Sequence, residues 1–152
     1  MNRKLYNIIS SLLVIPLISL MSVTSFAEDT SDLKPFAEVH VVLQLSDQSN
    51  EAVVLDVANN LIKNYGGPDV IDIEIVTFGK GIRLLFAGSE HKTRIASLVD
   101  NGVRFYVCEN TLDTIERKTG VRPELNEQAI FVRAGVAHII DKVAEGYTLV
   151  RP

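Results

Sequence analysis

The sequence predicts an α/β fold, a three-layer sandwich built on a mostly parallel sheet of about five strands. The first observation is that segments rich in β-branched residues alternate with segments of helical periodicity. The helical segments are roughly ten to sixteen residues long. The second is that Gly, Pro and Asn residues separate these segments. Strands that alternate with helices in this way are joined by right-handed crossovers, so most of them are expected to run parallel.

The first strand, helix and strand are the clearest elements. Residues 39–45 (VHVVLQL) and 70–78 (VIDIEIVTF) are rich in branched apolar residues and predict two strands. Between them, residues 49–65 place their apolar side chains on one helical face, after a Ser or Asn cap and before Gly66. This part of the chain predicts a strand, helix, strand unit.

The remaining elements are shorter. The pattern predicts strands at 103–108, 129–132 and 147–150, and helices at 89–100, 110–118 and 135–145. The segment 82–87 is compatible with either a helix or a loop. Periodicity does not order the strands, so it leaves the topology of the sheet open.

The N-terminus has the three zones of a secretory signal peptide. Basic Arg3 and Lys4 precede an apolar stretch at 5–23, and the small residues Ser25 and Ala27 follow it. We predict cleavage after Ala27 and a periplasmic or secreted protein that has no membrane contact once the signal is removed. The alternative is an uncleaved anchor, because a helix of this length nearly crosses a bilayer.

The part after the signal is one acidic domain. Residues 28–37 predict a flexible leader, and residues 38–152 form a domain of ordinary size. Removal of 1–27 leaves thirteen Lys and Arg against nineteen Asp and Glu, a net charge of −6. An acidic domain of this kind is not expected to bind nucleic acid.

Cys108 is the only cysteine of the chain, so no internal disulfide can form. It lies where the predicted third strand meets the next helix, and the positive end of that helix would favour the thiolate form. The opposing interpretation is a small buried side chain, because free cysteines are among the most buried residues. The adjacent Glu109 opposes thiolate formation if its charge turns inward.

Other candidate ligand-binding residues follow the strands of the predicted sheet. In parallel α/β sheets, ligands bind outside the carboxyl ends of the strands. Ser46 and Gln48 follow the first strand, Lys80 follows the second, and Asn110 and Thr111 follow the third. The backbone N–H groups near Asn110 and Thr111 are candidates for binding an anionic sulfur.

Motifs for other chemistry are weak. The three histidines have no zinc-type spacing with Cys108, so we predict no metal site, and His138 is expected on the polar side of its helix. The sequence has no G-x-S-x-G nucleophile motif, and the G-x-G at 79–81 lacks the third glycine of a dinucleotide fingerprint. We therefore predict no cofactor.

Arg104 and Tyr106 alternate with apolar residues on the predicted third strand. This places polar groups on one face of an otherwise buried strand. Two explanations are open: a contact between subunits, or an edge strand with one face in water.

From residue 39 to 152 the chain resembles the DsrE/DsrF-like family, which includes sulfur-relay subunits of the TusD type and YchN-like proteins. The resemblance is carried by VHVVLQLSD, IVTFGKGIRLL, NGVRFYVCENTLDTI and RAGVAHIIDKVAEGYTLVRP, in this order and spacing. In the relay members, a cysteine directly after the third strand carries sulfur as a persulfide, and Cys108 matches that position. The resemblance also implies the compact α/β sandwich and assembly into homotrimers or homohexamers.

The leading hypothesis is therefore an exported sulfur carrier or sulfurtransferase in which Cys108 holds a persulfide or a mixed disulfide. Its partner would be a sulfur donor or acceptor, either a protein or a small sulfur compound. The alternative is a non-catalytic oligomeric module in which Ser46, Gln48 and Lys80 bind a small anion and Cys108 is only packed.

Overall fold

A computed structural model describes Lys34 and residues 36–152. The predicted signal peptide at 1–27 and most of the predicted leader lie outside the described residues. Among the residues that are described, no helix is both long enough and apolar enough to cross a membrane.

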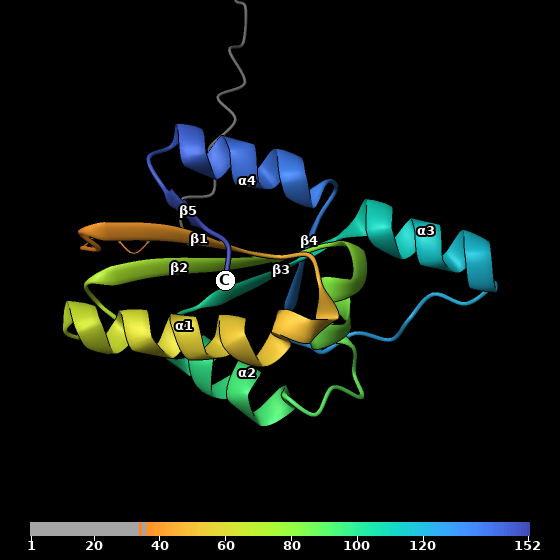
Figure 1. The fold of residues 1–152 in the computed structure, drawn as a ribbon, viewed down its shortest axis with the longest axis horizontal. Helices are drawn as coiled ribbons and strands as arrows, with labels where there is room; N and C mark the ends of the chain where they lie inside the picture. Colours follow the sequence, from red (N-terminus) through yellow and green to blue (C-terminus); the bar gives the residue numbers. More distant parts are fainter. Residues whose placement is uncertain (1–33, 35) are drawn as a thin grey trace, which may run out of the picture. The chain divides into compact units, whose positions relative to one another are not determined.

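The fold is built on one five-stranded sheet (Figure 1). Its strands are β1 (Val39–Leu45), β2 (Ile71–Thr77), β3 (Arg104–Cys108), β4 (Ala129–Val132) and β5 (Thr148–Val150). Their order is β4-β3-β2-β1-β5, and every neighbouring pair is parallel. The α/β sandwich with a parallel five-stranded sheet is thus confirmed, and the strand order is the part that the sequence left open.

Helices cover both faces of the sheet (Figure 1). The helical elements are the 3-10 helices η2 (Gln48–Asn50) and η3 (Gly79–Leu85), and the α-helices α1 (Glu51–Tyr65), α2 (Lys92–Asp100), α3 (Glu109–Thr119) and α4 (Gly135–Ala144). Helices α1 and α2 lie on one face, α4 lies alone on the other, and α3 extends beyond the carboxyl end of the sheet. The ambiguous segment 82–87 is mostly the end of η3.

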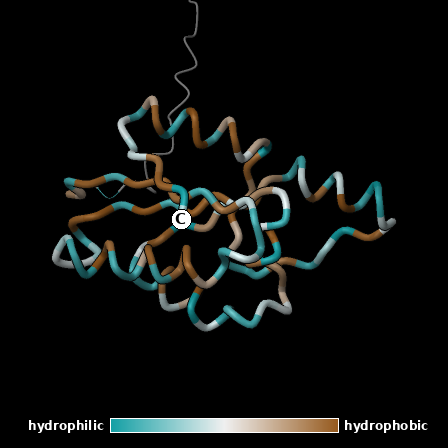
Figure 2. The backbone as a smooth tube through the Cα atoms, viewed as in Figure 1, coloured by the Kyte–Doolittle hydropathy of each residue, from teal (hydrophilic) through white to brown (hydrophobic). Residues whose placement is uncertain are grey.

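The two faces of the sheet carry hydrophobic clusters of different size. Because side chains alternate along a strand, Ile71, Ile73 and Ile75 face α1 and α2, where they join the main hydrophobic core. The opposite face carries a smaller apolar cluster, formed by Val42, Val76, Tyr106, Ile139 and Tyr147. Figure 2 shows the corresponding brown, apolar tracts along β1, β2 and α4.

Charged residues are buried beside the smaller cluster. Asp72 and Glu74, which alternate with the core isoleucines of β2, are 0% and 1% exposed. Arg104 donates from Nη2 to Asp72 Oδ2 and to Glu74 Oε1, each at 2.8 Å. The interpretation of β3 as an edge strand is wrong, because β3 lies between β2 and β4 and its polar face is covered by α4.

Lys34 makes the first described contacts of the chain. Its Nζ donates to the carbonyl oxygens of Pro68, Ile71 and Asn101 at 2.6, 3.2 and 3.1 Å. These three carbonyls lie at or before the starts of β2 and β3. Lys34, within the segment 28–37 that the sequence predicts as a flexible leader, therefore contacts the domain.

Candidate functional site

Cys108 is the last residue of β3 and the N-cap of α3. Its side chain is 6% exposed. Gly135, the first residue of α4, lies against it: a Cβ added at Gly135 would stand 3.3 Å from the Cys108 Cβ and 3.3 Å from a methyl group of Val76. The cysteine therefore lies where two helices begin, and it is covered by one of them.

This position has a defined electrostatic character. The first N–H groups of a helix have no acceptor within the helix, and together with the helix dipole they create positive potential at the N-terminus. Helix N-termini stabilise a cysteine thiolate for this reason. The half-buried Glu109 is an acidic residue in the first turn of α3.

Asn110 and Thr111 fasten this region to its neighbours. The Asn110 N–H donates to the Arg133 carbonyl oxygen at 3.2 Å, so it already has an acceptor. The Thr111 hydroxyl accepts a hydrogen bond from the Gly79 N–H at 3.2 Å. These bonds join the start of α3 to the segment before α4 and to η3.

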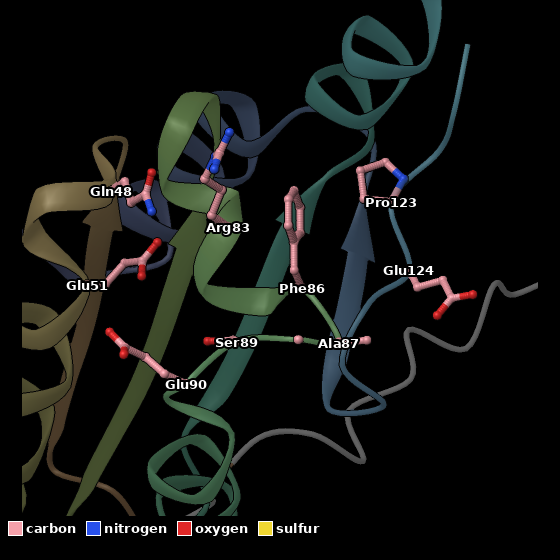
Figure 3. A pocket seen from close by; sticks show the side chains of 10 residues that line it. Gln48, Glu51, Arg83, Phe86, Ala87, Ser89, Glu90, Pro123 and Glu124 are labelled. Carbon is pink, nitrogen blue, oxygen red and sulfur yellow. The ribbon is translucent and has the colours of Figure 1, made fainter. Parts of the chain in front are cut away.

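The candidate ligand-binding residues that follow β1 and β2 lie away from Cys108. Gln48 and Lys80 line a cleft of about 530 Å³, and Gln48 also lines an adjoining cleft of about 550 Å³ (Figure 3). The Ser46 carbonyl oxygen accepts a hydrogen bond from the Gly81 N–H at 3.2 Å. Gly81 is required there, because a Cβ would stand 2.5 Å from the Leu45 carbonyl oxygen.

The lining of the two clefts is more acidic than basic. Glu51 and Glu90 border both clefts, together with Asp47 on one side and Glu124 on the other, whereas Lys80 and Arg83 are the cations. Burial raises the pKa of Glu51, although the nearby His91 partly offsets this effect. This charge balance does not favour the small anion that the alternative hypothesis requires.

The structure does not bring the two groups of candidates together. Among the described residues that line the clefts, none is Cys108, Asn110 or Thr111. Cys108 belongs to the sheet face of Tyr106, which α4 covers. The clefts are formed by η2, α1, η3 and residues 47, 86–91 and 123–124. The sulfur chemistry and any ligand of the clefts would therefore be separate.

Sequence reasoning missed a buried polar network on the face of Cys108. His138 Nε2 lies 2.7 Å from Glu74 Oε2, so His138 faces the sheet and is not on a polar outer side as expected. Tyr147 donates its hydroxyl to Asp72 Oδ2 at 2.6 Å. The signal that could have revealed this network is the pair Asp72 and Glu74, which interrupt a strand predicted to be buried.

The network shifts the pKa values of Glu74 and Tyr147. Burial alone would raise the pKa of Glu74, but hydrogen bonds from His138 and Arg104 outweigh burial and hold it below its usual value. Burial and the hydrogen bond to Asp72 raise the pKa of Tyr147. Glu74 is therefore a buried carboxylate with cationic or donor partners from both β3 and α4.

Comparisons with known proteins agree with this fold. The structure is similar to that of MTH1491, a protein of unknown function from Methanobacterium thermoautotrophicum, with a TM-score of 0.67 and 27% identity. The match covers 76% of this chain and 100% of that one. No curated protein matches the chain significantly.

The family comparison is more specific. The model of the DsrE/DsrF-like family matches residues 39–152, which include every strand and helix described above. A match of this extent confirms the resemblance carried by the four sequence blocks. The chain therefore belongs to the DsrE/DsrF-like family.

Proposed function

We propose that this chain is an exported sulfur-handling protein in which Cys108 carries sulfur as a persulfide or forms a mixed disulfide. The observation that carries the proposal is the position of the only cysteine, between the first turns of α3 and α4. Helix N-termini carry positive potential, which attracts anionic groups such as a persulfide. Membership of a family related to sulfur relay supports the same chemistry.

The proposed reaction is a thiol exchange. The Cys108 thiolate attacks the outer sulfur of a donor persulfide, R–S–SH, and the donor S–S bond breaks. The R–S⁻ leaving group takes up a proton, and Cys108 is left as Cys–S–SH. Attack of an acceptor thiol on the outer sulfur completes the transfer, so the cycle requires no external oxidant or reductant.

Intact mass measurement tests this proposal directly. The folded protein is incubated with inorganic polysulfide, and we expect Cys108 to gain the mass of one sulfur atom, which a reducing thiol then removes. Cys108→Ser is the matched control and should gain no mass. An unchanged mass of the original protein, under conditions that load a known persulfide carrier, would contradict the proposal.

Export rests on the sequence pattern at residues 1–27. In an oxidising compartment, the sulfur donor and acceptor would be extracytoplasmic proteins or small sulfur compounds. Expression of the full chain in a bacterium, followed by fractionation and N-terminal sequencing, tests this part. A periplasmic protein that begins at Glu28 is expected, and an uncleaved cytoplasmic chain would contradict export.

We also propose that the protein is a homo-oligomer, a trimer or a hexamer, in which the outer face of α4 is covered. Val136, Ile140 and Val143 recur at helical spacing on that face and are exposed, Ile140 by 62%. A helix that is apolar on both sides is expected to be covered on both. Light scattering should show a smaller assembly for Ile140→Glu than for the parent protein. The control Val53→Glu, on α1, should keep the size of the parent assembly. A monomeric parent protein would contradict the proposal.

A further inference from the structure

Cys108 lies beneath the start of α4. The cysteine is buried, and Gly135 at the start of α4 lies against its Cβ. Phe78 is also close, since its ring carbon would be 3.5 Å from a Cβ at Gly135. A sulfur donor must therefore displace the first turn of α4, or reach the thiol when that turn opens spontaneously.

The apolar contact between α4 and the sheet is small. Gly135 and Ile139 are the buried residues of α4, and Ile139 packs with Val42, Val76 and Tyr106. The other side of the sheet has a much larger core beneath α1 and α2. Local opening requires little energy where few apolar contacts are lost, so the polar contacts of α4 contribute much of its attachment to the sheet.

Those polar contacts converge on Glu74. His138 Nε2, one turn along α4 from Gly135, lies 2.7 Å from Glu74 Oε2. Lys142 Nζ, a further turn along, is 3.8 Å from Glu74 Oε1. The His138 ring also packs on Tyr106, with ring centroids 4.4 Å apart. One buried carboxylate of β2 thus contacts α4 at two successive turns.

We propose that Glu74 and His138 form a latch that holds α4 over Cys108 and sets the rate at which the thiol becomes accessible. His138 is a positioning residue in this device, because it acts on the cysteine only through α4. The role of this latch in sulfur transfer rests on the proposed function, whereas its control of access to the thiol does not. Release of the His138 contact would let the first turn of α4 separate from β3 without unfolding the main core.

The test is the rate at which a small thiol reagent labels Cys108 in the folded, full-length protein. His138→Ala removes the latch while keeping a good helix former in α4. We expect its labelling rate to rise about ten- to hundredfold, the factor that corresponds to one lost hydrogen bond to a charged group. His138→Gln places an amide donor near the original Nε2 and should restore a rate close to that of the parent protein.

A core variant separates local opening from general destabilisation. Val54 is fully buried beneath the opposite face of the sheet, so Val54→Ala lowers stability without touching α4. Its stability is measured by urea denaturation, and its labelling rate should stay near that of the parent. An equal rise in both variants, or no rise in His138→Ala, would overturn the latch.

Amide hydrogen exchange gives a second readout. Exchange within 135–144 should accelerate in His138→Ala, while exchange within α1 should not change. If labelling follows the latch but polysulfide never adds to Cys108, the proposed function fails and the latch stands. If sulfur adds to Cys108 at the same rate in all three variants, the latch fails and the proposed function stands.

Discussion

Gly135 and Cys108 lie so close that a side chain at position 135 would bring two Cβ atoms to 3.3 Å. This is tighter than an ordinary contact, and the Val76 methyl group is equally close on the other side. The glycine therefore permits the start of α4 to pack directly onto the end of β3.

Substitution of this glycine should loosen α4. We expect Gly135→Ala to lower the free energy of unfolding by about 1 to 3 kcal/mol, the usual cost of inserting a methyl group into a packed site. The measurement is urea denaturation. Gly88→Ala is the control, because a Cβ there meets no atom within 4 Å, and its stability should change by less than about 0.5 kcal/mol. Equal effects would show that the close approach does not matter.

The ion pairs of Arg104 and Arg94 differ in burial, so they should contribute differently to the free energy of unfolding. Arg104 contacts Asp72 and Glu74, which are almost fully buried, whereas Arg94 contacts the exposed Asp56 at 2.6 Å. Arg104→Leu leaves two buried carboxylates with fewer partners and should cost about 3 to 5 kcal/mol of stability. Arg94→Leu should cost no more than about 1 kcal/mol. Similar losses on thermal or urea unfolding would argue against a dominant role for the buried network.

Lys34 binds near the amino ends of β2 and β3, opposite the end where Cys108 lies. Lys34→Met keeps the apolar stem but removes three hydrogen bonds to backbone carbonyls. We expect a loss of about 1 to 3 kcal/mol, because three partly buried acceptors lose their shared donor. The exposed Lys118 gives the matched control, Lys118→Met, which should be nearly neutral. A neutral result for Lys34→Met would mean that water replaces the ammonium group at no cost.

The parts of the fold that the sequence predicts well are local. The predicted strand at 39–45 and the predicted helix end at Gly66 agree with β1 and α1, because strong periodicity and a glycine stop act within a few residues. Helix α2 begins at Lys92 and not at Ser89, and residues 86 and 87 before it pair with the segment around Leu125. That pairing depends on a distant part of the chain, so no local pattern predicts it.

The candidate site divides in the same way. The sequence places Cys108 at the junction of strand and helix, because both elements have their own signals. It does not reveal that Gly135 covers Cys108 or that His138 meets Glu74, since both contacts depend on α4 crossing over the sheet to reach β5. Gln48 and Lys80 share a cleft apart from Cys108. The alternation of side chains along a strand predicts which face of the sheet a residue occupies. It does not predict how the loops after the strands come together.

Glu74 makes stability depend on pH in a predictable direction. Its pKa in the folded protein lies below the ordinary value of 4.5, because hydrogen bonds from His138 and Arg104 outweigh burial. A carboxyl group of this kind contributes stability that is fully present above pH 4.5 and is lost as the pH falls through the lowered pKa.

The variant Glu74→Gln has nearly the same shape but no charge to lose. Glu74 also raises the pKa values of Tyr106, Lys142 and Tyr147, but these groups stay protonated in the acid range, so the difference between the two unfolding free energies there reports mainly on Glu74. We expect this difference to be largest near neutral pH and to shrink steadily below about pH 4.5. Urea denaturation at a series of pH values measures it. A difference that stays constant into the acid range would mean that folding does not lower the pKa of Glu74.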